Sequence, residues 1–338
     1  MARYTEISKQ LMKEPKKWLI TGVAGFIGSN ILEELLQLKQ EVVGIDNLST
    51  GFLHNLNEVK ENVGTENFDN FKFINTDISE ADFNDVSYEK IDYVLHQAAL
   101  GSVPRSINDP ITSHISNVDG FLNILNFAKN SDVKSFVYAS SSSVYGYHQE
   151  LPKKENNIGE PLSPYAATKY INEIYAEVYN KVYSFDSIGL RYFNVFGKRQ
   201  DPNGSYAAVI PKWIHKMAKN QEIEIFGDGE TSRDFCFVDN AVQANILSAL
   251  SSKESKNQIY NVAVNKQTTL NEVFNLIKEE LQNNSIPYTS SPIYKDFRQG
   301  DVRHSLADIS KITKELSYKP SHSIQEGLKI TVNYFLGK

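Results

Sequence analysis

The alternation of short β-rich runs with amphipathic helical stretches is the feature that most limits the folds open to this chain. The first two-thirds of the sequence contain six such runs, at 18–21, 41–46, 71–77, 92–99, 135–141 and 187–197. Apolar residues recur at three- and four-residue spacing in the segments between them, including 29–38, 118–129 and 164–183. Continuous apolar strands separated by helices indicate a parallel sheet covered on both faces. We therefore predict a Rossmann-type, doubly wound α/β fold.

The rhythm loosens after residue 197, which predicts two parts. Residues 1–197 are expected to form a dinucleotide-binding Rossmann domain, and residues 198–338 mainly a smaller C-terminal substrate-binding α/β region. Short runs such as EIEIF and IYNVA mix there with helices expected near 206–220, 239–251 and 269–283. Part of this region, around 235–264, is expected to return to the main sheet.

Charge and cysteine content exclude several classes of protein. The 338 residues carry a formal net charge of -6, which argues against the broad basic surface that nucleic-acid binding needs. The basic run at 13–17 is interpreted as a solvated segment before the first strand. Cys236 is the only cysteine, so no intramolecular disulfide or cysteine-rich metal site can form. No apolar run approaches the ~20 residues of a membrane span, and the N-terminus lacks a signal peptide's apolar stretch. We expect a cytoplasmic protein without metal, membrane or nucleic-acid partner.

A glycine-rich turn follows the first strand. The run WLITGVAGFIGSN places Gly22, Gly25 and Gly28 between a strand and a helix, where the backbone must approach a diphosphate closely. Asp46 ends the next strand about twenty residues on, where a carboxylate accepts hydrogen bonds from an adenosine ribose and repels a 2′-phosphate. This favours NAD over NADP. The alternative is that Asp46 only starts the turn NLSTG.

A second carboxylate, Asp77, closes the third predicted strand. It could reach the adenine amine or cap the segment that follows, and both interpretations stay open.

Tyr165 and Lys169 in SPYAATKY are four residues apart and hence on one helix face. A neighbouring ammonium stabilises a phenolate, so Lys169 is expected to lower the pKa of Tyr165 toward the range of a general base. Spacing alone is weak evidence, because Tyr334 and Lys338 share it. The pair at 165 and 169 is distinguished by the hydroxyl cluster 140–143 at the end of the preceding strand, where doubly wound folds bind ligands.

With these residues assembled, the chain resembles the extended short-chain dehydrogenase/reductase family, and within it the nucleotide-sugar 4-epimerases. The blocks TGVAGFIGSN, IDNLSTG, SSSSVYG, SPYAATK and RYFNVFG are similar to family blocks and occur in the family's order. Two further blocks, HQAALGSVPRSINDP and RQDPNGSYAAVIPKW, look like those of the subgroup that acts on N-acetylated UDP-hexosamines.

The resemblance implies NAD as the cofactor and a UDP-sugar as the substrate. The implied reaction is reversible 4-epimerisation of UDP-N-acetylglucosamine and UDP-N-acetylgalactosamine through a transient 4-keto sugar, with non-acetylated sugars accepted to a lesser extent. Tyr165 would be the base, and Lys169 would hold the nicotinamide ribose. Ser141 would bind the 4-oxygen, with Ser142 and Ser143 beside the sugar.

The resemblance also implies two sets of binding residues. Those for the cofactor are Gly22, Gly25, Phe26, Ile27, Gly28, Asp46, Asn47, Asp77, Ile78, Gln97, Ala98 and Ala99, with Tyr165 and Lys169. Those for the substrate are Gly101, Ser102, Ser141, Ser142, Ser143, Asn194, Ala208, Val209, Arg233, Arg298, Asp301 and Ser305. Of these, Asn194, Arg233 and Arg298 would hold the diphosphate, a role that suits the guanidinium fork.

Ser305 bears on substrate size. By resemblance it stands where epimerases restricted to non-acetylated sugars carry a tyrosine, so a small residue leaves room for an N-acetyl group. The alternative is that Ser305 only packs a loop.

Several other functions remain open. A nucleotide-sugar dehydratase or decarboxylase has the same fold, but related dehydratases carry Asp-Glu where this chain has Ser142 and Ser143. A UDP-glucuronate-type epimerase is a further alternative. A non-catalytic NAD-binding scaffold commonly lacks the tyrosine or the lysine, and both are present here. The resemblance also implies a homodimer joined through long helices that include 164–183.

Overall fold

A parallel sheet forms the centre of the computed structural model, which describes residues 2–84, 86–203, 207–297 and 302–338. Within these ranges the sheet has seven strands, and every neighbouring pair is parallel. They are β1 (Lys17–Thr21), β2 (Glu41–Asp46), β3 (Phe71–Asn75), β4 (Tyr93–His96), β5 (Ser135–Ser141), β6 (Ser187–Tyr192) and β11 (Gln258–Val262). Their spatial order is β11-β6-β5-β4-β1-β2-β3. The predicted doubly wound fold is confirmed.

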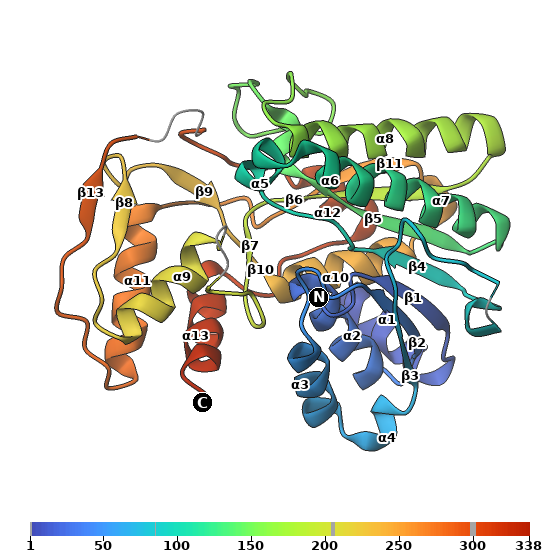
Figure 1. Ribbon diagram of the computed structural model, residues 1–338, viewed down its shortest axis with the longest axis horizontal. Coiled ribbons are helices and arrows are strands. Elements are labelled where there is room, and N and C mark those ends of the chain that lie inside the picture. Colours follow the sequence, from blue (N-terminus) through green and yellow to red (C-terminus); the bar gives the residue numbers. More distant parts are fainter. Residues whose placement is uncertain (1, 85, 204–206, 298–301) are drawn as a thin grey trace.

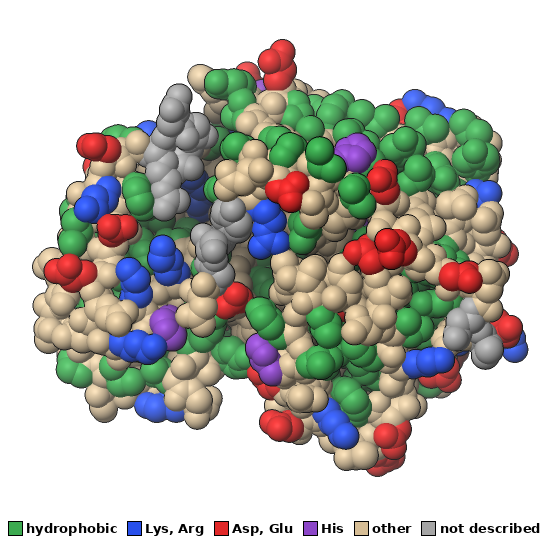
Figure 2. Space-filling view, viewed as in Figure 1, with side chains coloured by type: hydrophobic (Ala, Val, Ile, Leu, Met, Phe, Trp, Pro, Cys, Tyr) green, Lys and Arg blue, Asp and Glu red, His purple; other side chains and the backbone are tan. Residues whose placement is uncertain are grey.

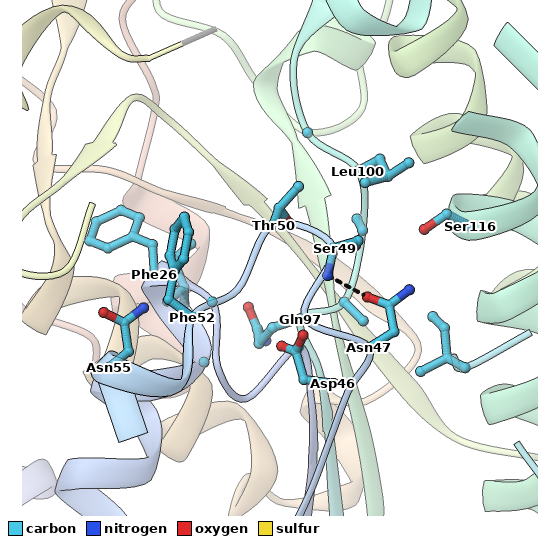
Figure 3. Close-up of a pocket in the computed structure, with 18 of the residues that line it drawn as sticks. Phe26, Asp46, Asn47, Ser49, Thr50, Phe52, Asn55, Gln97, Leu100 and Ser116 are labelled. Carbon is cyan, nitrogen blue, oxygen red and sulfur yellow. Dashed lines mark hydrogen bonds between the residues drawn. The ribbon is translucent and has the colours of Figure 1, made fainter. Parts of the chain in front are cut away.

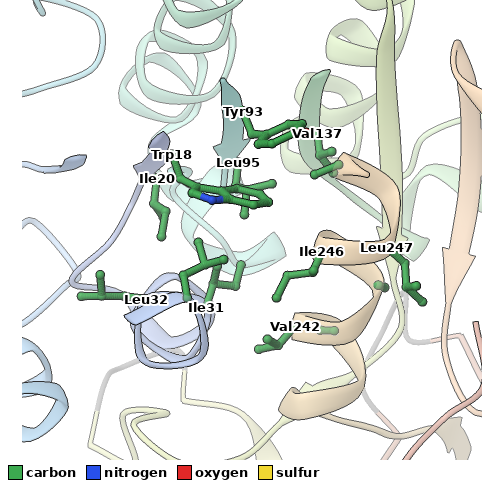
Figure 4. Packing of buried hydrophobic residues seen from close by; sticks show 14 of the residues in the cluster. Trp18, Ile20, Ile31, Leu32, Tyr93, Leu95, Val137, Val242, Ile246 and Leu247 are labelled. Atoms are coloured by element: carbon green, nitrogen blue, oxygen red, sulfur yellow. The ribbon is translucent and has the colours of Figure 1, made fainter. Parts of the chain in front are cut away.

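Helices cover both faces of this sheet (Figure 1). One face carries α1 (Ala2–Lys13), α2 (Phe26–Gln37), α3 (Leu53–Val63) and α10 (Val238–Ala249). The other carries α7 (Gly120–Asn130) and α8 (Pro164–Tyr183). Figure 4 shows the first of these cores, where Trp18 and Leu95 of the sheet meet Ile31 of α2 and Ile246 of α10. Continuous burial of the strands on both faces explains why their sequences are apolar throughout.

Helix α1 was not anticipated from the sequence. Only the basic run 13–17 was interpreted as solvated, and no helix was predicted before it, where Ile7 and Leu11 are buried in the core beside α2 and α10. The beginning of the basic run, Lys13 to Pro15, is exposed as expected, whereas Lys16 and Lys17 are partly buried.

The run predicted at 187–197 divides into β6 and β7 (Val195–Phe196). Asn194 lies between them in the left-handed region, with a φ of 34°, a conformation that asparagine tolerates better than most residues. The chain then leaves the main sheet, and β7 pairs with β10 (Cys236–Phe237). This break turns the polypeptide toward the second lobe.

The smaller lobe lies beside the sheet and has its own apolar core (Figure 1). Its elements are α9 (Val209–Ala218), α11 (Leu270–Asn283), α13 (Ile324–Phe335), β8 (Glu224–Phe226), β9 (Ser232–Asp234), β12 (Gln267–Thr269) and β13 (Ile293–Lys295). Shorter helices elsewhere are α4 (Thr65–Phe68), α5 (Val103–Asn108), α6 (Pro110–His114) and α12 (Ser310–Leu316), with the single turns η1 (Val86–Tyr88), η2 (Ile115–Asp119), η3 (Ser142–Tyr145) and η4 (Lys253–Ser255). Among the described residues, no helix combines the length and apolarity that crossing a bilayer demands.

The strand order reverses between β1 and β4, which is where open parallel sheets bind ligands. Thr21 and His96 end these two strands side by side, and the Thr21 hydroxyl lies 2.9 Å from His96 Nδ1. The chain diverges on either side of this pair, toward Gly22 and toward Gln97. The topology therefore opens a crevice where the glycine-rich turn begins.

Polar contacts fasten α8 to the end of β5. Lys169 Nζ donates to the Ala139 carbonyl oxygen at 2.9 Å. One turn further along α8, the Glu173 carboxylate accepts from the Ser140 hydroxyl at 2.5 Å and from Arg191 of β6 at 2.9 and 2.7 Å. The side chains of Glu173 and Arg191 are only 6% and 3% exposed. This buried ion pair fixes how α8 lies on the sheet.

Replacing Glu173 by Gln should lower the free energy of unfolding by about 3 kcal/mol, because it leaves the Arg191 charge buried without its partner. Glu177→Gln is the matched control, since Glu177 pairs with Lys181 on the exposed side of the same helix and its loss should cost less than about 1 kcal/mol. Urea unfolding measures both. Equal effects would show that the buried pair contributes no more than a surface pair.

Candidate active site

The glycine-rich turn brings backbone into close contact with backbone. Gly22 has a φ of 69°, and a Cβ added there would lie 2.7 Å from the Ala98 nitrogen. A Cβ on Gly28 would collide with the Gly22 carbonyl oxygen. Helix α2 begins directly after Gly25 without a side-chain cap, so the N–H groups of its first turn are available to an anion. The turn thus fits the diphosphate of a dinucleotide.

Asp46 lies at the end of β2 and is 7% exposed. Its carboxylate accepts from the Ala24 nitrogen at 3.0 Å and from the Leu48 nitrogen at 2.8 Å. Burial raises its pKa, and these backbone hydrogen bonds oppose that shift. Asp46 therefore organises the turn after β2 and the glycine-rich turn, and it also lines the cavity where a ribose would lie.

Asp77 lies two residues beyond the end of β3. One carboxylate oxygen accepts from the Ser79 nitrogen at 2.9 Å and so caps the following turn, while the other accepts from Asn47 Nδ2 at 2.6 Å. Because Asn47 and Asp77 both line the cavity, capping leaves the carboxylate within reach of a ligand there.

A cavity of about 340 Å³ follows the carboxyl ends of these strands (Figure 3). Among its lining residues are thirteen of the sequence candidates: Gly22, Gly25, Phe26, Ile27, Gly28, Asp46, Asn47, Asp77, Ile78, Gln97, Ala98, Ala99 and Gly101. Lining residues that sequence reasoning missed are Ser49, Thr50, Phe52, Asn55, Thr76, Leu100, Ser116, Arg199 and Asp201. The polar turn NLSTG was a usable signal for Ser49 and Thr50. Arg199 and Asp201 lie far along the chain, in the block RQDPNGSYAAVIPKW, which contributed to the family resemblance but was not assigned to this cavity.

The proposed catalytic hydroxyls converge at the start of α8. The Tyr165 phenol is hydrogen-bonded to the Ser141 side chain, and the Tyr165 nitrogen donates to Ser106 Oγ at 2.9 Å. Ser141 Oγ also accepts from the Ser143 nitrogen at 3.1 Å and lies 2.9 Å from Ser143 Oγ. Tyr165, Ser141 and Ser143 therefore form a chain of hydroxyl groups. Ser142 begins the adjoining turn η3.

The four-serine cluster divides into two functions. Successive side chains of a strand point to opposite faces, so Ser140 faces away from Ser141. Ser140 is buried and bonds to Glu173, whereas Ser141 bonds to the tyrosine. Ser140 thus helps to attach α8 to the end of β5.

The expected lowering of the Tyr165 pKa is wrong for the chain by itself. Burial raises the pKa of Tyr165, and the hydrogen bond from Ser141 only partly opposes this rise. Lys169 is 2% exposed, and its ammonium is directed at the Ala139 carbonyl. Burial lowers the pKa of Lys169 to about 8. Sequence spacing placed the pair on one helix face but could not reveal that Lys169 is buried and that Tyr165 is partly buried.

The remaining substrate candidates lie on separate elements and do not line the cavity. Ser102 caps α5, and the exposed Asn194 separates β6 from β7. Ala208 and Val209 begin α9, and Arg233 in β9 donates to the Ser232 carbonyl at 2.9 Å. Two further candidates, Arg298 and Asp301, fall outside the described residues.

Ser305 lies on a segment, residues 303–308, that is held along both edges. On one edge the Ser232 nitrogen donates to the Arg303 carbonyl at 3.0 Å, and the Ser305 nitrogen donates to the Ser232 carbonyl at 3.1 Å. On the other, the backbone of Lys153 pairs with Leu306 and Asp308 at 2.7 and 2.9 Å. Ser305 therefore stands beside Arg233 in a segment with little freedom to move aside.

Comparison with known proteins agrees with this geometry. The model of the NAD dependent epimerase/dehydratase family matches residues 18–263. UDP-glucose 4-epimerase from Mycolicibacterium smegmatis is 34% identical over 322 residues, covering 95% of this chain and 98% of its own. The structure of UDP-N-acetylglucosamine 4-epimerase from Methanobrevibacter ruminantium, in complex with UDP-N-acetylmuramic acid, is 40% identical with a TM-score of 0.87, covering 96% of this chain and 99% of its own. That of UDP-glucuronic acid 4-epimerase from Bacillus cereus, with UDP-glucuronic acid and NAD, is 28% identical with a TM-score of 0.82, covering 95% and 99%.

The cofactor of this chain is NAD, as the family and the glycine-rich turn indicate.

Gly28→Ala should weaken NAD binding by about a hundred-fold or more, because the added methyl collides with the Gly22 carbonyl and displaces the turn. The neighbouring Ser29→Ala is the control: it removes one hydrogen bond to the Phe26 carbonyl but adds no atom. Equilibrium dialysis with NAD compares them. An unchanged affinity of Gly28→Ala for NAD would contradict the assignment of the glycine-rich turn to NAD binding.

Proposed function

The chain belongs to the NAD dependent epimerase/dehydratase family, and we propose that its UDP-hexose 4-epimerase activity interconverts UDP-N-acetylglucosamine and UDP-N-acetylgalactosamine. The observation that carries this substrate assignment is the small side chain of Ser305 on a segment fixed along both edges. The hydroxyl chain from Tyr165 through Ser141 supports the chemistry.

The reaction would proceed by oxidation and re-reduction at the sugar's C4. Tyr165 takes the proton of the 4-hydroxyl, and Ser141 hydrogen-bonds the 4-oxygen. NAD, when bound, supplies the hydride acceptor for C4 and a positive charge. The 4-keto sugar then turns over about its diphosphate link. Hydride returns to the opposite face of C4 while Tyr165 gives its proton back to the 4-oxygen, so the base, the cofactor and the redox state are restored at the end of the cycle.

Tyr165 needs more positive charge than the chain alone provides. Because burial raises its pKa, the phenol keeps its proton at neutral pH in the structure described here. Lys169, with a pKa of about 8, is mostly protonated at pH 7. We propose that this ammonium holds the nicotinamide ribose, and that the charge needed to form the phenolate is complete only in the cofactor-bound enzyme.

Turning the keto sugar over requires a firmly held nucleotide and a loosely held hexose. This is an efficient use of binding energy, since contacts to the diphosphate are retained while the ring rotates. Asn194 and Arg233, together with Arg298, are proposed to bind the diphosphate.

A dehydratase would need another acid-base pair near the sugar to expel water. In this chain the corresponding positions are Ser142 and Ser143, and the Ser143 hydroxyl is hydrogen-bonded to Ser141. The epimerase is therefore favoured. UDP-glucose and UDP-glucuronate, which relatives of this fold bind or convert, remain the alternative substrates to compare.

We also propose that the protein forms a homodimer through α6 and α8. Both helices expose large apolar side chains, which gather at the upper right of the space-filling view (Figure 2). Ile111 of α6 is 72% exposed, and Val182 of α8 is 64% exposed. Ile107, Ile115, Ile174, Val178 and Tyr183 are further exposed side chains of the same helices and their neighbours α5 and η2. Contiguous apolar surface of this kind is typical of a protein interface.

Incubation of the enzyme with UDP-N-acetylglucosamine should yield UDP-N-acetylgalactosamine without net consumption of NAD. Tyr165→Phe should retain NAD but lose at least about a thousand-fold in kcat, because it removes the proton acceptor. Chromatography of the released nucleotide sugars measures both. Failure to form the epimer at any NAD concentration, or full activity in Tyr165→Phe, would contradict the proposal.

Ser305→Tyr should reduce kcat/KM for UDP-N-acetylglucosamine by about a hundred-fold while affecting UDP-glucose much less, since the fixed segment 303–308 cannot yield to the larger ring. Ser305→Ala should behave like the wild type with both sugars. An equal loss with both sugars in Ser305→Tyr would contradict the assignment of Ser305 to acetyl selection.

Ile111→Asp should convert the dimer to a monomer, because it places a charge in the apolar contact. Leu53→Asp, which alters a 52% exposed side chain on α3, should leave the dimer intact. Sedimentation velocity distinguishes them. A monomeric wild-type protein would refute the dimer itself.

A further inference from the structure

One wall of the nucleotide cavity comes from a distant part of the chain. Its other lining residues lie between Gly22 and Ser116, but Arg199 and Asp201 belong to the loop that follows β7 and leads into the smaller lobe. This loop therefore contributes a part of the cavity wall that comes from outside residues 22–116.

Arg199 attaches this loop to the two helices behind the glycine-rich turn. Its Nε donates to a Glu58 carboxylate oxygen of α3 at 2.9 Å, and its Nη2 pairs with Glu33 of α2. The Arg199 side chain is fully buried, which is unusual for a charged residue. Its backbone lies in the left-handed region, with a φ of 63°, so the surrounding contacts hold it in a conformation that arginine seldom adopts.

Neighbouring contacts reinforce the attachment. Lys198 Nζ lies 3.5 Å from Glu33, and the Lys198 carbonyl accepts from Asn30 of α2 at 3.2 Å. Asn30 also donates to the carbonyl of Phe26, at the start of α2 in the cavity wall. From the smaller lobe, the Tyr334 hydroxyl of α13 donates to Glu58 at 2.7 Å.

We propose that Arg199 retains NAD in the enzyme, as a clasp that keeps the loop 198–201 closed against α2 and α3. Opening this wall requires the guanidinium to leave two carboxylates at once, and a planar fork that binds both is held more firmly than a point charge would be. Retention serves a reaction in which the hydride removed from a sugar must return to the same sugar. The Arg199 guanidinium binds Glu58 and Glu33 rather than a reacting group, so Arg199 is a positioning residue. Burial lowers its pKa to about 10, so it keeps its charge at neutral pH.

The rate of NAD release tests the clasp without relying on turnover. Each variant is loaded with NAD, passed into NAD-free buffer, and sampled over time for protein-bound NAD. Arg199→Lys should release NAD about ten-fold faster or more, because an ammonium cannot hold both carboxylates and affinity changes appear mainly in the dissociation rate. Circular dichroism and the melting temperature of the NAD-saturated protein show whether it is folded.

Tyr334→Phe provides a second, milder variant that keeps Arg199 in place. It removes one tyrosine–glutamate hydrogen bond at the clasp and should speed NAD release by about two- to five-fold. Its matched control is Tyr260→Phe, which removes the tyrosine–glutamate bond to Glu315, 2.6 Å long, away from the cavity. Wild-type release from folded Arg199→Lys, or equal release from Tyr334→Phe and Tyr260→Phe, would overturn the proposal. If Arg199→Lys does not fold, the comparison of NAD release between Tyr334→Phe and Tyr260→Phe tests the proposal by itself.

Discussion

The attachment of α8 to the end of β5 determines the geometry of the whole reactive centre. Lys169 donates to Ala139, and Glu173 one turn later binds Ser140 and Arg191. These contacts bury two charged groups of one helix, which is costly unless each finds a partner. With both satisfied, α8 can lie in only one way on the sheet, and Tyr165 is brought against Ser141.

The cofactor site depends on a different constraint, namely the close approach of backbone at the glycine-rich turn. Gly22 and Gly28 leave no room for side chains, so the uncapped start of α2 can meet a diphosphate directly. Asp46 then links this turn to the end of β2 through backbone hydrogen bonds. The parallel sheet joins the two halves of the site, because β1, β4 and β5 end at the same edge.

Local signals explain what could be predicted from the sequence. The strand and helix periodicity and the glycine spacing each occupy a few consecutive residues, so the fold and the glycine-rich turn followed from them. Most other lining residues, such as Gln97 and Ala98, were named only because the chain resembles a known family. Only the structure could reveal the features that depend on residues far apart in the sequence. Arg199 binds Glu58, which is 141 residues away in the sequence. The pKa of Tyr165 is raised by burial, which cannot be deduced from the spacing of residues in the sequence.

Two smaller differences have equally physical causes. Helix α1 was missed although Tyr4, Ile7 and Leu11 recur at helical spacing in it, and these residues pack into the core beside α2 and α10. The serine cluster was treated as one unit, although strand alternation by itself separates Ser140 from Ser141. Both features therefore had a periodic signal in the sequence, of period 3.6 for α1 and of period 2 for the serines.

In the proposed mechanism, hydride leaves C4 of the sugar and returns to C4 within the same site. Conversion of UDP-N-acetylglucosamine carrying deuterium at C4, in ordinary water, tests it most directly. The UDP-N-acetylgalactosamine formed should retain the deuterium at C4, observed by mass spectrometry and NMR. An epimer that carries solvent hydrogen at C4 would contradict it.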